Sequence, residues 1–333
     1  MRLSGRERPQ GNRKKRHLRS ALPPAWRTPT AFALAPTTPL SHTPQMQSAT
    51  IRVPATTANL GPGYDCLGIA LGLANQVTVT RLDVKPAASA EFHPGDAMVA
   101  EVAEHFFRKA ALPDFPFSWS ITGDVPPSRG MGSSVTVRLG ILAGLNALCH
   151  SPLSKHALFE LCATLEGHPD NAAPAAFGGF TVAGGSGTAR FEVSPDLAFV
   201  LLIPDFEVST PAARQVLPPQ LDHAAAVLSC ANACRITAAF ASQNYALLRG
   251  AFIDGLHQPF RRALIPFLNE VVVAGENAGA LGGFLSGSGS TICCVTLQDA
   301  ESVAAAMSAA APGAHRMVVT RADNTGVVVM SAP

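Results

Sequence analysis

Apolar residues recur with two different spacings over the first 204 residues, one typical of strands and the other of helices. Gln76 to Val84 alternates between apolar and polar residues, which is the period of a half-buried strand. Met98 to Ala111 instead carries apolar residues at helical spacing. Leu197 to Ile203 is a continuous apolar run closed by Pro204, as expected of a strand buried on both faces. The other elements predicted in this half are strands at Ile51 to Pro54 and Phe115 to Thr122 and helices at Val135 to Cys149 and Ser154 to Leu165.

The second half has an order of elements that indicates its topology. Its last elements run helix, strand, strand, helix, strand, which is the order of a split βαβ sandwich. No internal repeat is visible. We therefore predict two α+β domains, one over residues 48–200 and one over residues 201–333. The predicted elements are helices at Leu221 to Phe240, Phe267 to Ala278 and Ala300 to Ala310, and strands at Leu281 to Leu285, Thr291 to Leu297, Arg316 to Thr320 and Gly326 to Met330.

Charge separates the N-terminal segment from the rest of the chain. Residues 1–47 hold nine Lys or Arg and one acid, Glu7, whereas 16 basic and 22 acidic residues follow position 47. We expect this basic, proline-rich segment to be disordered. It could be a transit peptide, a nucleic-acid-binding arm, or sequence upstream of a true start at Met46. We favour the last, because Met46 lies just before the first predicted strand, so that residues 1–45 would not belong to the native protein.

Composition restricts the class of protein. A chain of 333 residues that is 47% hydrophobic and 14% charged can bury the core of one large or two ordinary domains. No uninterrupted apolar stretch of about 18 residues is present, so we expect no membrane span. The seven cysteines show no paired metal-ligand spacing and lie mostly in apolar patterns. They indicate buried thiols in a reducing compartment, which we expect to be the cytoplasm.

The first candidate for chemistry is the turn Pro126 to Ser134, which runs straight into a predicted helix. Its glycines allow the backbone to fold closely around an anion, and the N–H groups of the helix start point at the bound charge. It is not a P-loop, because no lysine lies between Lys109 and Lys155. The turn predicts a nucleotide phosphate site, and the alternative is an ordinary serine-capped helix.

The segment Glu166 to Asn171 places an acid, an imidazole, a second acid and an amide in six residues. Glu166 together with a loop hydroxyl could hold Mg²⁺, a hard ion that prefers oxygen ligands. Phosphoryl transfer needs such an ion. Alternatively, Asp170 or Asn171 only caps a helix and Glu166 is a solvated residue of a last helical turn.

Two further loops could bind ligands. Leu285 to Thr291 has alternating glycines that could form an anion-binding nest or a flexible hairpin turn. Thr56 to Asp65 carries Asn59 and Asp65 on a glycine-kinked loop, where either residue could bind a ligand or merely form the turn.

These loops resemble a known family. Pro54 to Asp65, Pro127 to Ser134 and Leu285 to Thr291 are similar, in order and spacing, to the three signature motifs of the GHMP kinases. Within that superfamily the chain is similar to the homoserine kinase family, from about residue 49 to the C-terminus. The resemblance implies an α+β, two-domain GHMP kinase fold, with a ribosomal protein S5 domain 2-like N-terminal domain and a ferredoxin-like C-terminal domain. The segments that carry the narrower similarity are Gly167 to Pro174, Ser209 to Arg214 and His257 to Arg261.

The resemblance implies ATP-dependent phosphorylation of the side-chain hydroxyl of L-homoserine, a step of threonine biosynthesis. Mg²⁺ would be held by Ser134 and Glu166, and the implied catalytic residues are Asp170, Asn171 and Arg214. The residues implied for L-homoserine are Asn59, Asp65, His168, Asp170, Thr210, Arg214 and Arg261. The residues implied for ATP are Pro127, Ser128, Arg129, Gly130, Met131, Gly132, Ser133 and Ser134, with Gly287 and Gly289 of the later loop.

The residues agree with these roles. A zwitterionic amino acid needs a carboxylate near its ammonium, as Asp65 or Asp170 could supply, and a guanidinium for its own carboxylate. We expect catalysis by positioning and charge stabilisation, and we name no base.

Other functions remain open at this point. The chain could be a GHMP kinase for another small alcohol such as mevalonate, or a catalytically silent GHMP-fold sensor. The intact Ser134, Glu166 and Asp170 argue against the sensor. The expected partners are L-homoserine and ATP, with no nucleic acid and no membrane, and the resemblance allows a homodimer. Nucleic-acid binding through the tail would instead predict retention on DNA at low salt that disappears when residues 1–45 are deleted.

Overall fold

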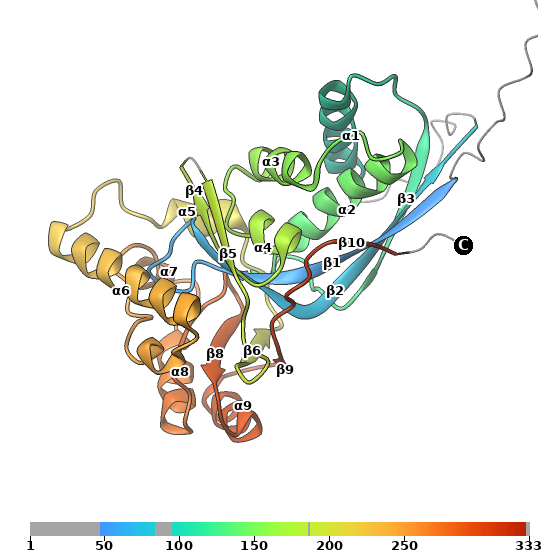
Figure 1. Ribbon diagram of the computed structural model, residues 1–333. Helices are drawn as coiled ribbons and strands as arrows, with labels where there is room; N and C mark the ends of the chain where they lie inside the picture. Colours follow the sequence, from blue (N-terminus) through green and yellow to red (C-terminus); the bar gives the residue numbers. More distant parts are fainter. Residues whose placement is uncertain (1–46, 84–94, 186, 331–333) are drawn as a thin grey trace, which may run out of the picture. The chain divides into compact units, whose positions relative to one another are not determined.

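The computed structural model describes residues 47–83, 95–185 and 187–330, which lie within one compact unit. All but Gln47 of the predicted basic tail lies outside the described residues, so the disorder expected of it stays a prediction. The described part contains two antiparallel sheets (Figure 1). The first has the strand order β10-β1-β2-β4-β5, with β3 also paired to β2, and the second has the order β7-β8-β6-β9.

The first sheet is built on two long strands, β1 (Ser48–Ala58) and β2 (Leu67–Arg81). The early part of β2 pairs with β4 (Phe180–Gly184), and its later part pairs with β3 (Phe117–Gly123). The predicted strand at 51–54 is therefore confirmed, and the one at 76–84 is confirmed as far as Arg81, with Val84 outside the described residues. Both strands are longer than predicted, because both begin earlier and β1 also ends later. Residues 54–58 and 67–71 are buried without interruption, so they lack the alternation by which a half-buried strand is detected. The hairpin partner of β4 is β5 (Gly187–Phe191).

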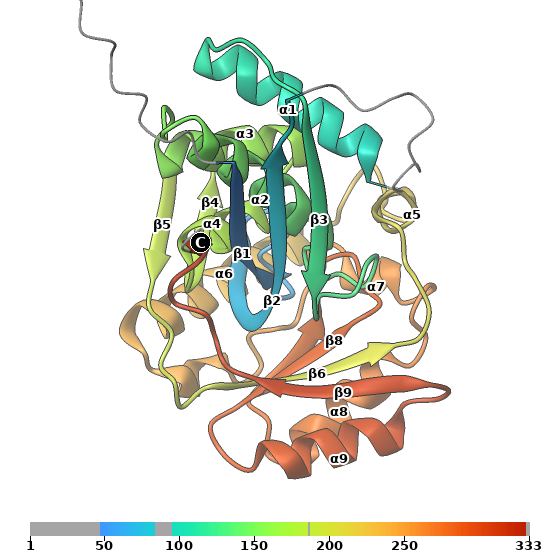
Figure 2. The same cartoon turned by 90° about the vertical axis from the view of Figure 1, so that its right-hand side faces the viewer.

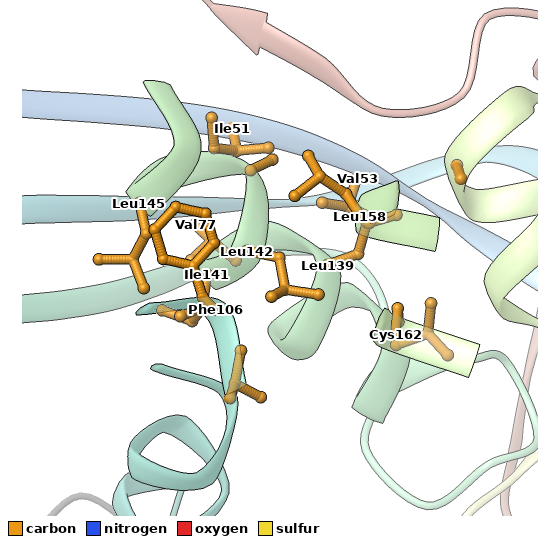
Figure 3. Close-up of a cluster of buried hydrophobic side chains, with 14 of the residues drawn as sticks. Ile51, Val53, Val77, Phe106, Leu139, Ile141, Leu142, Leu145, Leu158 and Cys162 are labelled. Atoms are coloured by element: carbon orange, nitrogen blue, oxygen red, sulfur yellow. The ribbon is translucent and has the colours of Figure 1, made fainter. Parts of the chain in front are cut away.

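Helix α2 (Ser133–Leu148) lies against this sheet and is almost wholly buried. Its apolar side chains pack on those of β1 and β2 in the cluster drawn in Figure 3, which includes Ile51, Val77 and Leu142. Gly140 allows close approach, because a Cβ atom at this position would lie 2.6 Å from a methyl carbon of Val77. Since α2 begins directly after the glycine turn, this packing also fixes the turn.

Three more helices complete this half of the molecule, and α1 and α3 pack on α2 (Figure 2). The predicted helices at 98–111, 135–149 and 154–165 are confirmed within about two residues. The short elements α4, β4 and β5 were not predicted, because five or six residues are too few to show a period. The bounds are α1 (Asp96–Ala110), α3 (Lys155–Glu166) and α4 (Ala172–Phe177).

The second sheet has the ferredoxin-like order expected of a split βαβ sandwich. All its pairings are antiparallel, and α8 and α9 pack together beside it. The predicted order of strands and helices in this half is therefore confirmed. Between β6 and α8 the chain adds α5, α6, a short 3₁₀ helix and α7, which carry part of the candidate site. The bounds are β6 (Ala198–Pro204), α5 (Thr210–Gln215), α6 (His223–Ser242), the 3₁₀ helix (Tyr245–Leu248), α7 (Gln258–Arg261), α8 (Leu268–Asn277), β7 (Gly282–Leu285), β8 (Ile292–Thr296), α9 (Ala300–Ala310) and β9 (His315–Thr320).

The last strand departs from the predicted division of the chain at residue 200. The strand β10 (Val328–Met330) pairs with β1 of the first sheet, with Ile51 opposite Val329. Close by, Arg52 Nη1 donates to Asp323 Oδ2 at 2.6 Å. The two sheets also share one apolar cluster, to which β2 of the first sheet and β6 of the second both contribute. Apolar periodicity identified the strand β10 correctly but carries no information about its partner.

Helix α6 is unusual for its composition. Among the described residues it is the one helix long and apolar enough to cross a membrane by length and composition, and only 28% of its most apolar window is buried. Its inward residues include Ser229 and Asn232, which bond to the neighbouring segment, and Phe240, which stacks on Phe180 with ring centroids 4.3 Å apart. It is therefore packed as a surface helix, with its buried side chains on the apolar cluster that the two sheets share. Cys230 and Cys234 on α6 are exposed, contrary to the expectation of buried thiols.

Candidate active site

The three loops singled out by the sequence meet in space. Thr57 Oγ1 donates to Ser286 Oγ at 2.8 Å, and Ser286 Oγ donates to the carbonyl oxygen of Gly130 at 2.7 Å. The backbone N–H of Thr56 donates to the carbonyl oxygen of Met131 at 3.1 Å. Loops from the first, middle and last thirds of the chain thus hold one another in place.

The glycine turn is open toward a ligand at the start of α2. Gly132 is the N-cap residue with a φ of 68°, and no side chain among the described residues caps the helix there. Ser133 and Ser134 lie inside the first turn, so the interpretation as a serine-capped helix is wrong. Gly130 has a φ of 71°, and a Cβ atom there would lie 2.1 Å from the carbonyl oxygen of Ser286. An uncapped helix start with free N–H groups suits an anion.

One cavity of about 550 Å³ joins these loops. Of the residues expected to bind ATP, Mg²⁺ or L-homoserine, all but Gly289 line it. Gly289 instead packs against Ile265 and Leu285 beneath its loop. The lining residues assigned a role from the sequence are Asn59, Asp65, Pro127 to Ser134, Glu166, His168, Asp170, Asn171, Thr210, Arg214, Arg261 and Gly287. Ser209, Pro211 and Ser288 lie in segments that the sequence singled out, and Gly95, Met98, Val137 and Val208 lie outside them.

Two oxygen-bearing side chains from different helices meet beside the glycine turn, and with the turn they are called here one end of the cavity. Ser134 Oγ donates to Glu166 Oε2 at 3.0 Å. The other oxygen of Glu166 is paired with Arg138, and only 8% of the Glu166 side chain is exposed. A hydroxyl and a carboxylate beside an anion-binding turn are ligands that suit Mg²⁺. Arg138 was missed, although its position four residues after Ser134 places it on the same face of α2.

Beside this pair, His168, Asp170 and Asn171 form a bonded cluster. His168 Nδ1 and Asp170 Oδ1 are 2.6 Å apart, and Oδ1 also accepts from the backbone N–H of Asn171 at 2.9 Å. The hydrogen bond with Asp170 raises the pKa of His168 above its usual range. Asn171 occupies the N-cap of α4 without a capping bond, and its Oδ1 accepts from Thr56 Oγ1 at 2.6 Å. The alternative that these residues only cap a helix is therefore wrong for Asn171.

A second group of lining residues, called here the other end of the cavity, contains an ion pair. Arg214, in the last turn of α5, donates to both carboxylate oxygens of Asp65, with Nη2 to Oδ1 at 2.9 Å. Both side chains are partly exposed. Arg214 Nη1 also donates to Tyr64 Oη at 2.9 Å, a contact that no pattern in the sequence indicated.

Oxygen and nitrogen ligand atoms of Asp65, His168 and Asp170 lie within 4.8 Å of one another. Two carboxylates so close together attract a cation, which could be a metal ion or an ammonium group. Asp65 already pairs with the guanidinium of Arg214, so this end of the cavity suits a ligand that carries both charges.

Asn59 and Arg261 complete the lining and are both buried. Asn59 Nδ2 donates to the carbonyl oxygen of Gly287 at 3.0 Å, and its Oδ1 accepts from the backbone N–H of Asp65 at 2.9 Å. Asn59 therefore ties two loops together, which is the turn-forming role that the sequence left open. Arg261 lies at the end of α7 beneath Tyr64, with its guanidinium carbon 5.3 Å from the ring centroid.

Comparisons with known proteins bear on the two halves of the chain and on its relatives. The family model described as the GHMP kinases N terminal domain matches residues 97–179, and the model described as GHMP kinases C terminal matches residues 236–313. A homoserine kinase of Synechococcus sp. is 40% identical over 275 residues, which cover 77% of this chain and 89% of that protein. A homoserine kinase of Moorella thermoacetica is 37% identical over 270 residues, or 78% of this chain and 91% of that protein.

A solved structure supports the fold. The crystal structure of homoserine kinase from Cytophaga hutchinsonii superposes with a TM-score of 0.78 at 24% identity. The match covers 87% of this chain and 100% of that one. Both sheets and the helices between them thus have counterparts in a known architecture.

Proposed function

This chain belongs to the homoserine kinase family of the GHMP kinases, and from that membership we propose that it transfers the γ-phosphoryl group of ATP to the side-chain hydroxyl of L-homoserine. The product is O-phospho-L-homoserine, and the reaction is a step of threonine biosynthesis. One observation supports this most strongly. A single cavity has an uncapped helix start and the Ser134–Glu166 pair at one end and the Asp65–Arg214 ion pair with Arg261 at the other.

The nucleotide would lie along the glycine turn. The free N–H groups at the start of α2 would donate to phosphate oxygens, and the helix dipole favours their negative charge. Mg²⁺, held by Ser134 Oγ and Glu166, would neutralise charge on the phosphates. Arg138 keeps one oxygen of Glu166 occupied from within the protein and leaves the oxygen near Ser134 for the ion.

L-Homoserine would lie at the charged end. Its ammonium group fits the two carboxylates of Asp65 and Asp170, and its carboxylate fits the guanidinium groups of Arg214 and Arg261. Asp170 Oδ1 already accepts from His168 and Asn171, while Oδ2 has no hydrogen bond to another described residue. Oδ2 is therefore the atom of Asp170 left to receive a donor from the substrate. The residues would thus act by holding hydroxyl and γ-phosphate in line rather than by a dedicated base.

An ATP-consumption assay with Mg²⁺ tests the proposal. Purified protein is offered L-homoserine, L-threonine, L-serine and mevalonate at equal concentrations, and product is identified by mass. Turnover should be fastest with L-homoserine. Turnover with mevalonate alone would show that the chain is a kinase for another small alcohol. Mevalonate has no ammonium group to pair with the carboxylates of Asp65 and Asp170. Binding of ATP without turnover of any alcohol would establish the silent sensor.

We also propose that the chain works in the cytoplasm as a homodimer, with no membrane or nucleic-acid partner. The outer face of α6 supports self-association, because Val227 and Leu228 are 55% and 47% exposed and Arg235 is the single charged residue of the helix. Light scattering should give twice the mass of the chain, and Leu228→Glu should reduce it to the monomer. The control Val329→Glu, an exposed site on β10, should leave the mass unchanged. A monomeric wild type would refute the dimer.

A further inference from the structure

The guanidinium group of Arg261 forms hydrogen bonds with three acceptors of the protein. Its Nε donates to the carbonyl oxygen of Ala213 at 3.1 Å, and its Nη1 donates to the carbonyl oxygen of Gly287 at 2.9 Å. The third acceptor is Nδ1 of His257, 3.1 Å from Nη1. Nη2 has no hydrogen bond to another described residue, and Arg261 lines the cavity. The protein therefore uses two of the three guanidinium nitrogens and leaves one for a ligand.

His257 is wholly buried, and its hydrogen bonds determine where its proton lies. Nε2 is 2.8 Å from the carbonyl oxygen of Gly61, which can only accept, so Nε2 must carry the proton. Nδ1 faces the guanidinium of Arg261, which can only donate, so Nδ1 must present its lone pair. Both contacts therefore require a neutral ring of His257 that carries its proton on Nε2.

The surroundings of the ring hold it in this state and orientation. Asp254 accepts from the backbone N–H groups of His257 at 3.2 Å and of Gln258 at 2.8 Å, which fixes the first residues of α7. The ring of Tyr64 packs on His257, with centroids 5.2 Å apart. Burial lowers the pKa of His257 to about 4, and the positive charge of Arg261 acts in the same direction, while the negative charges of Asp254 and Asp170 oppose it.

We propose that His257 is a positioning residue that acts through Arg261. By accepting from Nη1, it turns the guanidinium so that Nη2 faces the carboxylate of the amino-acid substrate. Selection of substrates that carry a carboxylate then depends on a residue that never touches them. This inference rests on the proposed function, in which Arg261 binds the carboxylate of L-homoserine.

Two substitutions of His257 distinguish its role as the acceptor for Arg261 from its contribution to packing. His257→Asn keeps an acceptor near the position of Nδ1, whereas His257→Gln keeps a polar group near the position of Nε2 and loses the acceptor for Arg261. His257→Gln should raise the KM for L-homoserine about tenfold, because a hydrogen bond to a charged group is lost, while the KM for ATP stays within about twofold of wild type. His257→Asn should remain within about twofold of wild type for both substrates.

The carboxylate dependence gives a second kinetic readout. 3-Amino-1-propanol has the ammonium and hydroxyl of L-homoserine without its carboxylate. The ratio of kcat/KM for L-homoserine to that for 3-amino-1-propanol should fall about tenfold in His257→Gln and stay at the wild-type value in His257→Asn. The proposal would be overturned if kcat/KM fell equally for both substrates in both variants. It would also be overturned if kcat/KM for L-homoserine were higher in His257→Gln than in His257→Asn.

A measurement on the unmodified protein covers the case in which the variants do not fold. ¹⁵N NMR of histidine-labelled wild type at pH 7 should show His257 as the Nε2–H tautomer, with an Nδ1 resonance that shifts on addition of L-homoserine and not of 3-amino-1-propanol. An Nδ1–H tautomer, or equal shifts with both compounds, would overturn the proposal. Failure of the wild type to phosphorylate L-homoserine would refute the proposed function instead, and the tautomer would still report the contact with Arg261.

Discussion

The two ends of the cavity are made from different parts of the polypeptide. The end proposed to bind phosphate consists mainly of backbone, with Gly130 and Gly132 at positive φ and the uncapped start of α2. The end proposed to bind the amino acid consists of charged side chains, with Arg214 bonded to Asp65 and Arg261 bonded to His257. At the first end one short, continuous segment, the turn from Pro127 to Ser134, supplies most of the lining, and Glu166 of α3 joins it. At the second end the site exists only after distant segments have come together.

This difference determines how each end should respond to substitution. A backbone site tolerates changes of side chain but not a change of φ or of the closest approach between loops. A side-chain site should lose affinity for one substrate at a time, because each charge faces one group of the ligand. The four predictions below test this contrast.

The largest effect is expected at Gly130. Gly130→Ala adds a Cβ atom 2.1 Å from the carbonyl oxygen of Ser286 at a positive φ. Strain and overpacking together should lower the free energy of unfolding by about 4 kcal/mol, and the displaced turn should lower kcat/KM for ATP. Gly313→Ala is the matched control, because it has a φ of 73° and nothing within 4 Å of the added atom. If both variants changed kcat/KM for ATP and the free energy of unfolding in urea equally, the contact between the loops of Gly130 and Ser286 would be unimportant.

The next effect is expected at Glu166. Glu166→Gln keeps the shape of the side chain but removes the charge proposed to hold Mg²⁺, so kcat should fall about 100-fold. The Kd for L-homoserine, measured calorimetrically, should change less than about twofold. Glu160→Gln, on an exposed face of the same helix, should behave as wild type. A normal kcat in the Glu166 variant would exclude its role in binding the metal.

A smaller and more selective effect is expected at the charged end. Arg214→Ala should raise the KM for L-homoserine about tenfold or more, because a hydrogen bond to a charged group contributes about 1.5–3 kcal/mol. The KM for ATP should not change, and Arg321→Ala, at an exposed site, should leave both constants unaltered. If the KM for ATP rose as much as that for L-homoserine, the two ends of the cavity would not be separable.

The smallest effect concerns pH. The hydrogen bond with Asp170 raises the pKa of His168, so the folded protein favours the protonated ring. The resulting stability is fully present below the ordinary pKa of about 6.5 and is lost as pH rises through the raised value. Urea unfolding of wild type and His168→Asn should therefore differ more at pH 6 than at pH 9, by about 1 kcal/mol or less. An equal difference at both pH values would show that His168 does not titrate in this range.

The same contrast explains what could be predicted from the sequence. The turn around Gly130 was predicted because glycine and serine in a short segment are themselves the site. Arg138 and Tyr64 were not, because each acts on a partner from another element, Glu166 and Arg214. His257 lies four residues before Arg261 in a segment that the sequence singled out, but its tautomer depends on the carbonyl oxygen of the distant Gly61. Asp65, Arg214 and Arg261 were assigned by family resemblance, since spacing alone does not bring their three segments together.

For the fold, local periodicity predicted most helices and the order of strands in the second sheet. It did not predict the full lengths of β1 and β2, whose buried parts lack alternation. It also could not show that β10 returns to the first sheet. Pairing of strands depends on contacts between residues far apart in sequence, and the pattern along one strand does not identify its partner.

The return of β10 to β1 has a consequence for biosynthesis. Arg52 and Asp323, which form an ion pair beside these strands, are separated by 271 positions. On the ribosome, the first sheet is therefore left with an unpaired edge at β1 until the whole second sheet has been translated. An unpaired edge strand can join another chain. The nascent chain is thus exposed to misassembly during that interval, and completion of β10 pairs residues 50–52 of β1 and couples the folding of the two sheets.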